Sequence, residues 1–253
     1  MRPEHSPAEF RRLKAKTFRI ARTLERSLGV PRQKRRLPPP LDMLVATILS
    51  QNTNDKNSHR AYTALRAEFP RWEDAALAPL RAIVRAIRVG GMANQKAACI
   101  KATLTAVKRR YGMYSLAALR RKSNDEVMRE LLDLNGVGLK TAACVLLFSL
   151  GRDVFPVDTH IHRICNRLGL VPLTPTPEKT FIAMQPLVPP GRGYSFHTNL
   201  IRFGRAVCRS AKPRCAVCPL YNECEYDEKA RMRNSGRRTA PPGDFDFMLL
   251  DNV

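Results

Sequence analysis

The stretch Leu134-Asn-Gly-Val-Gly-Leu-Lys-Thr-Ala142 decides the fold of this chain. Gly136 and Gly138 flank Val137 between two helical patterns, and glycines allow a tight hairpin whose backbone can come close to another molecule. The first N–H groups of the following helix point outward and favour phosphate oxygens. The pattern predicts a helix-hairpin-helix that binds a nucleic-acid backbone without reading bases. An ordinary turn between two helices would use the same glycines.

The segments around this hairpin indicate an all-α protein, because no sustained alternation of apolar and polar residues occurs. Ser123 and Glu126 have the spacing of a capping box, and Thr176 before Pro177 marks another helix start. The helix after the hairpin, which runs to Leu150, is apolar nearly all round and is therefore expected to be buried. Further helices are expected over residues 9–28, 41–49, 56–69, 80–89, 95–111, 125–132 and 158–168.

The charge of the chain indicates a polyanionic partner. It has 44 Lys and Arg against 22 Asp and Glu, a net charge of +22, and a pI of about 10.5. Nucleic acid is the expected partner, because no apolar run approaches the roughly 20 residues of a membrane-spanning helix. The charged N-terminus lacks the apolar core of a signal peptide, so we expect an intracellular, DNA-associated protein.

Four cysteines near the C-terminus form the pattern C-x6-C-x2-C-x5-C. They are Cys208, Cys215, Cys218 and Cys224. Four thiolates this close can hold either an iron–sulfur cluster or a zinc ion. The x6 and x5 intervals differ from the paired C-x2-C pattern of common zinc sites. The other three cysteines, Cys99, Cys144 and Cys165, lie in apolar helical patterns and are expected in the core.

Two further residues could carry chemistry. Lys140 stands at the start of the buried helix, where the positive end of the helix dipole disfavours a second positive charge, and a neutral amine is a nucleophile. It could equally be a lysine that only contacts phosphate. Asp158 could place a carboxylate beside this amine, but aspartate before a helix is also a favoured N-cap. Spacing alone favours the cap for Asp158.

Taken together, three motifs resemble the endonuclease III family of helix-hairpin-helix DNA glycosylases/AP lyases with a 4Fe-4S cluster. They are residues 134–142, the run Val157-Asp-Thr-His-Ile161 with Arg163-x-Cys-Asn-Arg167, and the four cysteines. They occur in the family's order and spacing, and the resemblance covers roughly residues 41–226.

The resemblance implies an all-α, two-domain glycosylase fold with a DNA cleft between the domains. A basic N-terminal segment, residues 1–41, would contribute a helix to the cluster domain. Residues 42–151 would form a six-helix barrel with the hairpin, residues 152–228 the iron–sulfur domain, and residues 229–253 a disordered tail. We expect a monomer.

The resemblance also assigns roles to residues. Lys140 would be the nucleophile, Asp158 the catalytic aspartate, and the four cysteines the ligands of a 4Fe-4S cluster. Met92 would be a wedge in the duplex, and Asn52 would contact the orphaned base; either could instead be a plain turn or cap residue. The hairpin Gly136-Val-Gly138 would bind phosphate. The cluster loop would present three basic residues to phosphates, namely Arg209, Lys212 and Arg214.

The implied activity is base excision repair of double-stranded DNA containing damaged bases or abasic sites. A damaged, by default oxidised, pyrimidine would be flipped out, and a Schiff base on Lys140 would lead to β-elimination on the 3′ side. A non-catalytic DNA-binding module and a monofunctional glycosylase are the alternatives. Retention of Lys140 and Asp158 argues against the module, and retention of Lys140 argues against the monofunctional enzyme.

Three departures from the family pattern matter: the first loosens the entry to the hairpin but leaves its glycines, and the other two bear on the substrate. Asn135 replaces the usual proline before Gly-Val-Gly, and Ser50-Gln-Asn-Thr-Asn-Asp55 differs from the more common Ser-Ala-Gln-Ala-Thr-Asp. Val154-Phe-Pro-Val-Asp158 with Val171-Pro-Leu-Thr-Pro175 also resembles the plant demethylating glycosylases of the same superfamily. A 5-substituted cytosine or uracil, or a mismatched base, is therefore the alternative substrate.

Overall fold

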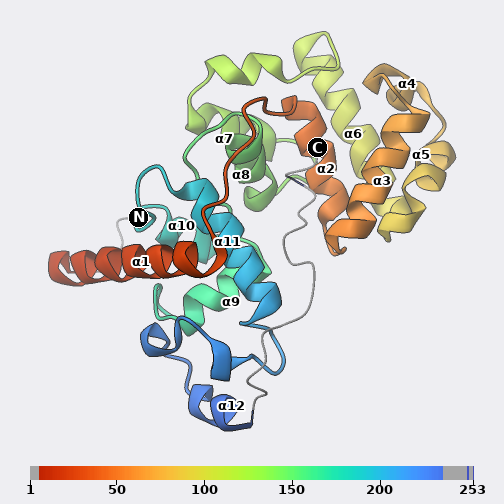
Figure 1. The fold of residues 1–253 in the computed structure, drawn as a ribbon. Helices are drawn as coiled ribbons and strands as arrows, with labels where there is room; N and C mark the ends of the chain where they lie inside the picture. Colours follow the sequence, from red (N-terminus) through yellow and green to blue (C-terminus); the bar gives the residue numbers. More distant parts are fainter. Residues whose placement is uncertain (1–5, 236–249, 251–252) are drawn as a thin grey trace. The chain divides into compact units, whose positions relative to one another are not determined.

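The computed structural model of the protein describes residues 6–235, Leu250 and Val253 (Figure 1). These residues form helices and loops with no strand among them, which confirms the all-α prediction. They divide into two compact units. Unit 1 contains residues 6–32 and 153–235, and unit 2 contains residues 33–152 with Leu250 and Val253.

Unit 2 is built around two almost wholly buried helices, α2 (Pro40–Ser50) and α8 (Leu139–Phe148), which pack against each other. Every residue of α8 from Thr141 to Phe148 is buried, as its all-round apolar pattern predicts. The other elements of the unit pack on this pair or on one another. They are α3 (Asp55–Glu68), α4 (Trp72–Leu77), α5 (Leu80–Ile87), η1 (Arg88–Gly90), α6 (Ala93–Tyr111), η2 (Ala117–Arg121) and α7 (Asn124–Leu132).

The predicted capping box begins α7. Ser123 Oγ accepts from Glu126 N at 3.3 Å, and Ser123 N donates to Glu126 Oε2 at 2.8 Å. Such a cap stabilises a helix by about 1 kcal/mol. Because α7 packs on α8, the cap also fixes the helix that enters the hairpin between them.

Unit 1 is built around α11 (Gly193–Ala206), which packs against α1 (Pro7–Leu28) and α9 (Thr159–Arg167). Ion pairs of Lys16 with Glu225 and of Arg19 with Glu223 join α1 to the loops that carry the cysteines. The predicted cap of α10 is present, since Thr176 Oγ1 accepts from Lys179 N. The remaining elements are α10 (Pro177–Met184), η3 (Cys215–Val217), η4 (Tyr221–Glu223) and α12 (Lys229–Ser235).

The division between the units falls after residue 32, ahead of the proline run expected to mark it. Residues 33–39 belong to unit 2, because Gln33 Nε2 donates to Leu147 O at 2.7 Å and Ser149 Oγ to Pro38 O at 2.6 Å.

A second difference lies at the start of the expected disordered tail, where the structure has α12. The Lys229 amine donates to Cys224 O, and the Arg233 guanidinium lies 4.5 Å from the Tyr221 ring centroid. These contacts order residues that have too few apolar side chains to signal a helix. Beyond residue 235, most of the tail lies outside the described residues.

Candidate functional site

The fold requires glycine at one of the two hairpin positions but not at the other. Gly136 has φ +80°, and a Cβ added to it would lie 2.5 Å from Cys99 Sγ, so the fold itself requires glycine there. Gly138 has φ −98° and ψ 178°, which any residue can adopt, and a Cβ added to it would meet nothing within 4 Å. No packing within the described chain therefore demands Gly138, and its open face is available to another molecule.

Helix α8 begins at this open face. Ala142 N donates to Gly138 O at 3.0 Å, and no side chain among the described residues caps the N–H groups ahead of it. Uncapped N–H groups at a helix start favour an anion. Val137 is buried at 6% exposure and anchors the hairpin tip, with its N–H donating to Leu134 O.

Lys140 is the second residue of α8 and is half-buried. Within the described part of unit 2, its amine has no ion-pair or hydrogen-bond partner. Its neighbour Thr141 accepts from Gln51 Nε2 at 3.5 Å, and the same nitrogen lies 3.4 Å from Gly136 O. Gln51 thus joins the end of α2 to the hairpin.

The structure brings together Asn52 and Met92, which lie 40 positions apart in the chain. Asn52 Nδ2 is 3.8 Å from Met92 Sδ. Both residues have φ +51°, in the left-handed region that is unusual for a residue other than glycine. Both are exposed, Met92 at 48%. A strained pair of exposed side chains on adjacent loops is typical of a functional site.

Lys96, which the sequence patterns did not single out, lies directly beneath this pair of loops. Its amine is buried and donates to Leu49 O at 2.8 Å and Gly90 O at 2.9 Å. The sequence does contain a signal for its burial, because Lys96 stands at helical spacing from Ile100 and Leu104, in the apolar stripe of α6.

Asp158, in unit 1, is the N-cap of α9. Its Oδ1 accepts from Ile161 N at 2.8 Å. The capping interpretation is therefore confirmed. In the described part of unit 1, Asp158 Oδ2 has no hydrogen bond, so this oxygen is available to interact with another group while Oδ1 caps the helix. Asp158 thus belongs to unit 1 and Lys140 to unit 2.

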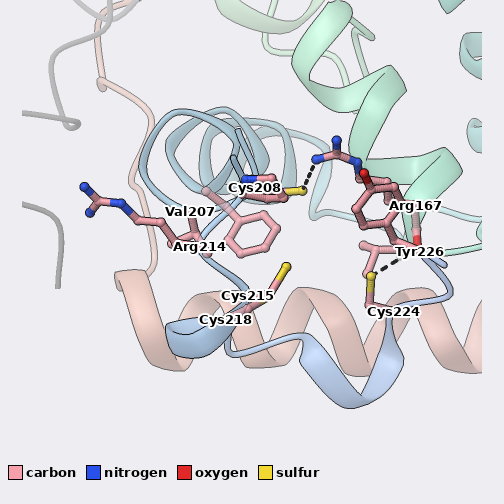
Figure 2. Close-up of a pocket in the computed structure, with 11 residues that line it drawn as sticks. Arg167, Val207, Cys208, Arg214, Cys215, Cys218, Cys224 and Tyr226 are labelled. Carbon is pink, nitrogen blue, oxygen red and sulfur yellow. Dashed lines mark hydrogen bonds between the residues drawn. The ribbon is translucent and has the colours of Figure 1, made fainter. Parts of the chain in front are cut away.

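The four cysteines line one pocket in unit 1 (Figure 2). Its empty volume is about 350 Å³ including its open mouth, and Leu168, Phe203 and Val207 form apolar walls. Cys144 and Cys165 are buried elsewhere as expected, whereas Cys99 is half-buried against Gly136.

Two arginines of α9, one helical turn apart, hold the loop that begins with Cys208. Arg167 Nη1 donates to Cys208 Sγ at 3.5 Å and to Arg209 O at 2.7 Å, and Arg163 Nη2 donates to Cys208 O at 2.7 Å. The Arg167 guanidinium also lies 4.4 Å from the Tyr226 ring centroid (Figure 2). The arginines of the Arg163-x-Cys-Asn-Arg167 motif are half-buried and support the cysteine loop through these hydrogen bonds.

The three basic residues of the cysteine loop differ in exposure. Lys212 is exposed with φ +52°, whereas Arg209 and Arg214 are half-buried. Arg209 Nε donates to Arg205 O at 3.2 Å. Arg214 Nη1 is buried with no hydrogen-bond partner in the described chain. Contact of these residues with phosphate stays a prediction, and Lys212 is the residue best placed for it.

The model of the HhH-GPD superfamily of base excision DNA repair proteins matches residues 45–190. The chain belongs to this superfamily. It is also 34% identical over 202 residues to endonuclease III of Thermotoga maritima, which covers 79% of this chain and 90% of that protein. The resemblance to the endonuclease III family is therefore confirmed.

Plant relatives match this glycosylase-family chain as well. A candidate DNA glycosylase of Arabidopsis thaliana is 40% identical over 190 residues, covering 71% of this chain and 64% of that protein. Protein ROS1A of Oryza sativa subsp. japonica is 33% identical over 226 residues. That match covers 83% of this chain but 11% of ROS1A, so the chain spans only a small part of such relatives.

Solved structures agree with the family. A non-covalent endonuclease III–DNA complex has a TM-score of 0.73 at 26% identity, covering 87% of this chain and 98% of the other. A trapped covalent endonuclease III–DNA intermediate gives the same TM-score and identity, covering 87% and 99%. No helix in the described residues of this glycosylase-family chain has the length and apolar character needed to span a membrane.

The four thiols that line the cysteine pocket match the donor set of the 4Fe-4S cluster that the family implies. Within the described residues, no group of three or more His, Cys, Asp or Glu side chains is placed to hold a metal ion, so the cluster stays a prediction. Four thiols around a pocket suit a cluster, in which each iron takes one thiolate.

Burial of the cysteines affects the pKa of their thiols. Burial, with the neighbouring cysteines, raises the pKa of Cys218 to about 12. Burial likewise raises the pKa of Cys215 and of Cys224. A positive centre is therefore needed to hold them as thiolates at neutral pH.

Proposed function

We propose that the protein is a bifunctional DNA glycosylase and AP lyase of base excision repair, with Lys140 as its nucleophile. The observation that carries the proposal is the start of α8. An uncapped helix N-terminus, an open Gly138 and an amine unpaired within its unit stand within three residues of one another. The first two suit a DNA phosphate, and the amine suits the sugar next to it.

The chemistry follows from these groups. The damaged base must leave the stack before an amine can reach its sugar. Lys140 Nζ then attacks C1′, the glycosidic bond breaks, and the base leaves with the bonding electrons and is protonated. Asp158 accepts the proton that the amine loses and balances the positive charge that develops on the sugar.

The resulting Schiff base makes β-elimination possible. Its cationic nitrogen acidifies the C2′ hydrogens, so loss of one C2′ proton expels the 3′ phosphate. The strand is cut on the 3′ side of the lesion, and hydrolysis of the Schiff base regenerates Lys140. A lysine that only binds phosphate would form no Schiff base and lead to no strand cleavage. These two steps therefore distinguish the enzyme from a DNA-binding module.

DNA contacts are assigned to the remaining predicted residues. Gly136, Val137 and Gly138 would bind the backbone through the hairpin, and Met92 and Asn52 would fill the gap that the base leaves. The basic residues of the cysteine loop would contact phosphates. They are Arg209, Lys212 and Arg214.

A 4Fe-4S cluster would be held by Cys208, Cys215, Cys218 and Cys224. Such a cluster would cross-link the cysteine loop and would supply no step of the reaction. We also infer that unit 2 is the six-helix barrel of the family and unit 1 its cluster domain, and that the protein acts as a monomer on duplex DNA inside the cell.

An oxidised pyrimidine is the substrate that we propose first. The match to endonuclease III over nearly its full length supports it. A 5-substituted cytosine is the second candidate, favoured by the match to ROS1A over 83% of this chain. Single-lesion duplexes carrying thymine glycol, 5-methylcytosine or a mismatch, each with all four opposite bases, decide between them. Fastest excision of 5-methylcytosine would overturn the first candidate. If no base is excised and no abasic site is cleaved, the proposal that the protein is an enzyme is refuted.

A further inference from the structure

Two loops of unit 2 hold the strained pair. One joins α2 to α3 and carries Asn52, and the other joins η1 to α6 and carries Met92. A residue such as Met92 in the left-handed region costs about 1–2 kcal/mol and persists only where its surroundings impose it, whereas asparagine, as at Asn52, adopts this region more readily. The contact of Asn52 with Met92 is too weak to impose two such conformations.

The group that joins the two loops is the Lys96 amine. It has three donors, and three acceptors take them. They are Leu49 O, from the last turn of α2, Thr53 Oγ1 at 3.3 Å, and Gly90 O. Thr53 Oγ1 also donates to Gly90 O, which closes the network. The donor set is complete, as a buried ammonium requires.

No carboxylate pairs with this ammonium in the described chain, and Lys96 is 3% exposed. Burial lowers its pKa. Burying a charge against carbonyl oxygens alone is unfavourable compared with an apolar side chain of similar volume. A leucine or methionine would complete the apolar stripe of α6 at lower cost, so packing alone does not explain a lysine at this position, whereas its three hydrogen bonds do.

We propose that Lys96 is a positioning residue for base extrusion, which holds Asn52 and Met92 in the left-handed conformations from which their side chains enter the duplex. The inference rests on the proposed function. It deepens that function by assigning the set-up of the wedge to a buried residue that touches neither DNA nor the reacting atoms.

The test compares Lys96→Met with Lys101→Met in the full-length protein. Lys101 lies on the same helix and also donates to a loop carbonyl, that of Ala78, away from the Asn52 and Met92 loops. The probe is a duplex with 2-aminopurine opposite a tetrahydrofuran abasic site, and its fluorescence rises when side chains displace the orphaned base. Saturating protein separates this rise from affinity.

We expect the fluorescence to rise with wild type and with Lys101→Met, but not with Lys96→Met. We also expect Lys96→Met to excise the base from a lesion duplex about 100-fold more slowly, which is the effect of misplacing a group by about 1 Å. The same rise with Lys96→Met as with Lys101→Met would overturn the inference. If Lys96→Met does not fold, Thr53→Val removes one acceptor in a nearly isosteric way. A rise with Thr53→Val equal to that of wild type would then overturn the inference, and a smaller rise supports it.

The proposed function fails by a different result. Absence of borohydride-trapped adduct with wild type on an abasic duplex would overturn the lyase, whatever the fluorescence shows. No rise with wild type, despite a trapped adduct, would overturn the wedge and the inference together while the lyase stands.

Discussion

Replacing Gly138 by alanine should separate DNA binding from folding in this protein. The added methyl group meets nothing within 4 Å, and the backbone at φ −98° is relaxed for alanine. Alanine also has fewer unfolded conformations than glycine, so the free energy of unfolding should rise by about 0.4–1 kcal/mol. The same methyl group would stand where the proposed phosphate meets the start of α8.

Gly136→Ala is the matched control in the same hairpin. Alanine at φ +80° costs about 1–2 kcal/mol, and its Cβ would lie 2.5 Å from Cys99 Sγ. We therefore expect Gly136→Ala to lower the free energy of unfolding, in the opposite direction from Gly138→Ala.

The loss of DNA affinity can be estimated for Gly138→Ala. A hydrogen bond to a charged group contributes about 1.5–3 kcal/mol, so loss of one phosphate contact weakens binding about 10- to 100-fold. Since backbone N–H groups make the contact, the slope of log K against log salt should stay unchanged. Fluorescence anisotropy with an abasic duplex, at several salt concentrations, measures both quantities, and urea unfolding measures stability.

Two results would refute this reasoning. Wild-type affinity in Gly138→Ala would mean that no phosphate approaches the hairpin. Destabilisation of Gly138→Ala as large as that of Gly136→Ala would mean that Gly138 is a packing residue of the fold.

Other changes test the remaining parts of the site. Asp158→Asn keeps the helix cap but removes the charge, so the rate of single-turnover excision should fall about 100- to 10,000-fold without loss of stability. Asp158→Ala also removes the cap and should in addition lower the free energy of unfolding by about 1 kcal/mol. Equal rates of excision by Asp158→Asn and wild type would exclude a catalytic role for Asp158. Cys218→Ser should remove the brown colour and iron of the purified protein and weaken DNA binding; a colourless wild type containing zinc would refute the cluster, and unchanged affinity in the variant would mean that the loop does not contact DNA. Arg167→Met removes donors to the Cys208 loop and should speed bleaching of the cluster in air, whereas Arg85→Met, which breaks an exposed ion pair with Glu68 in unit 2, should leave the rate unchanged. Equal rates of bleaching in the two variants would refute the supporting role of Arg167.

The sequence was sufficient for features that depend on neighbouring residues. The capping box at Ser123, the cap at Thr176 and the burial of α8 follow from spacing within one or two turns, and all are present. The two glycines predicted a hairpin, but only the structure shows that Gly136 is needed for packing and that Gly138 is open.

Features that depend on distant contacts were not visible in the sequence. Lys96 reads as an interruption of an apolar stripe until Leu49 O and Gly90 O are placed around its amine. The helix α12 is tied to the cysteine loop by contacts of Lys229 and Arg233, which no hydrophobic pattern reveals. Contacts between residues so far apart in the sequence can be identified only in the folded structure.

The measurement that tests the central claim most directly is the location of the covalent adduct. The wild-type protein is trapped with borohydride on a duplex that contains an abasic site, digested, and analysed by peptide mass spectrometry. We predict a sugar adduct on Lys140 and no adduct with Lys140→Ala. An adduct on another residue, an adduct that persists in Lys140→Ala, or no adduct with the wild type would contradict the assignment of Lys140 as the nucleophile.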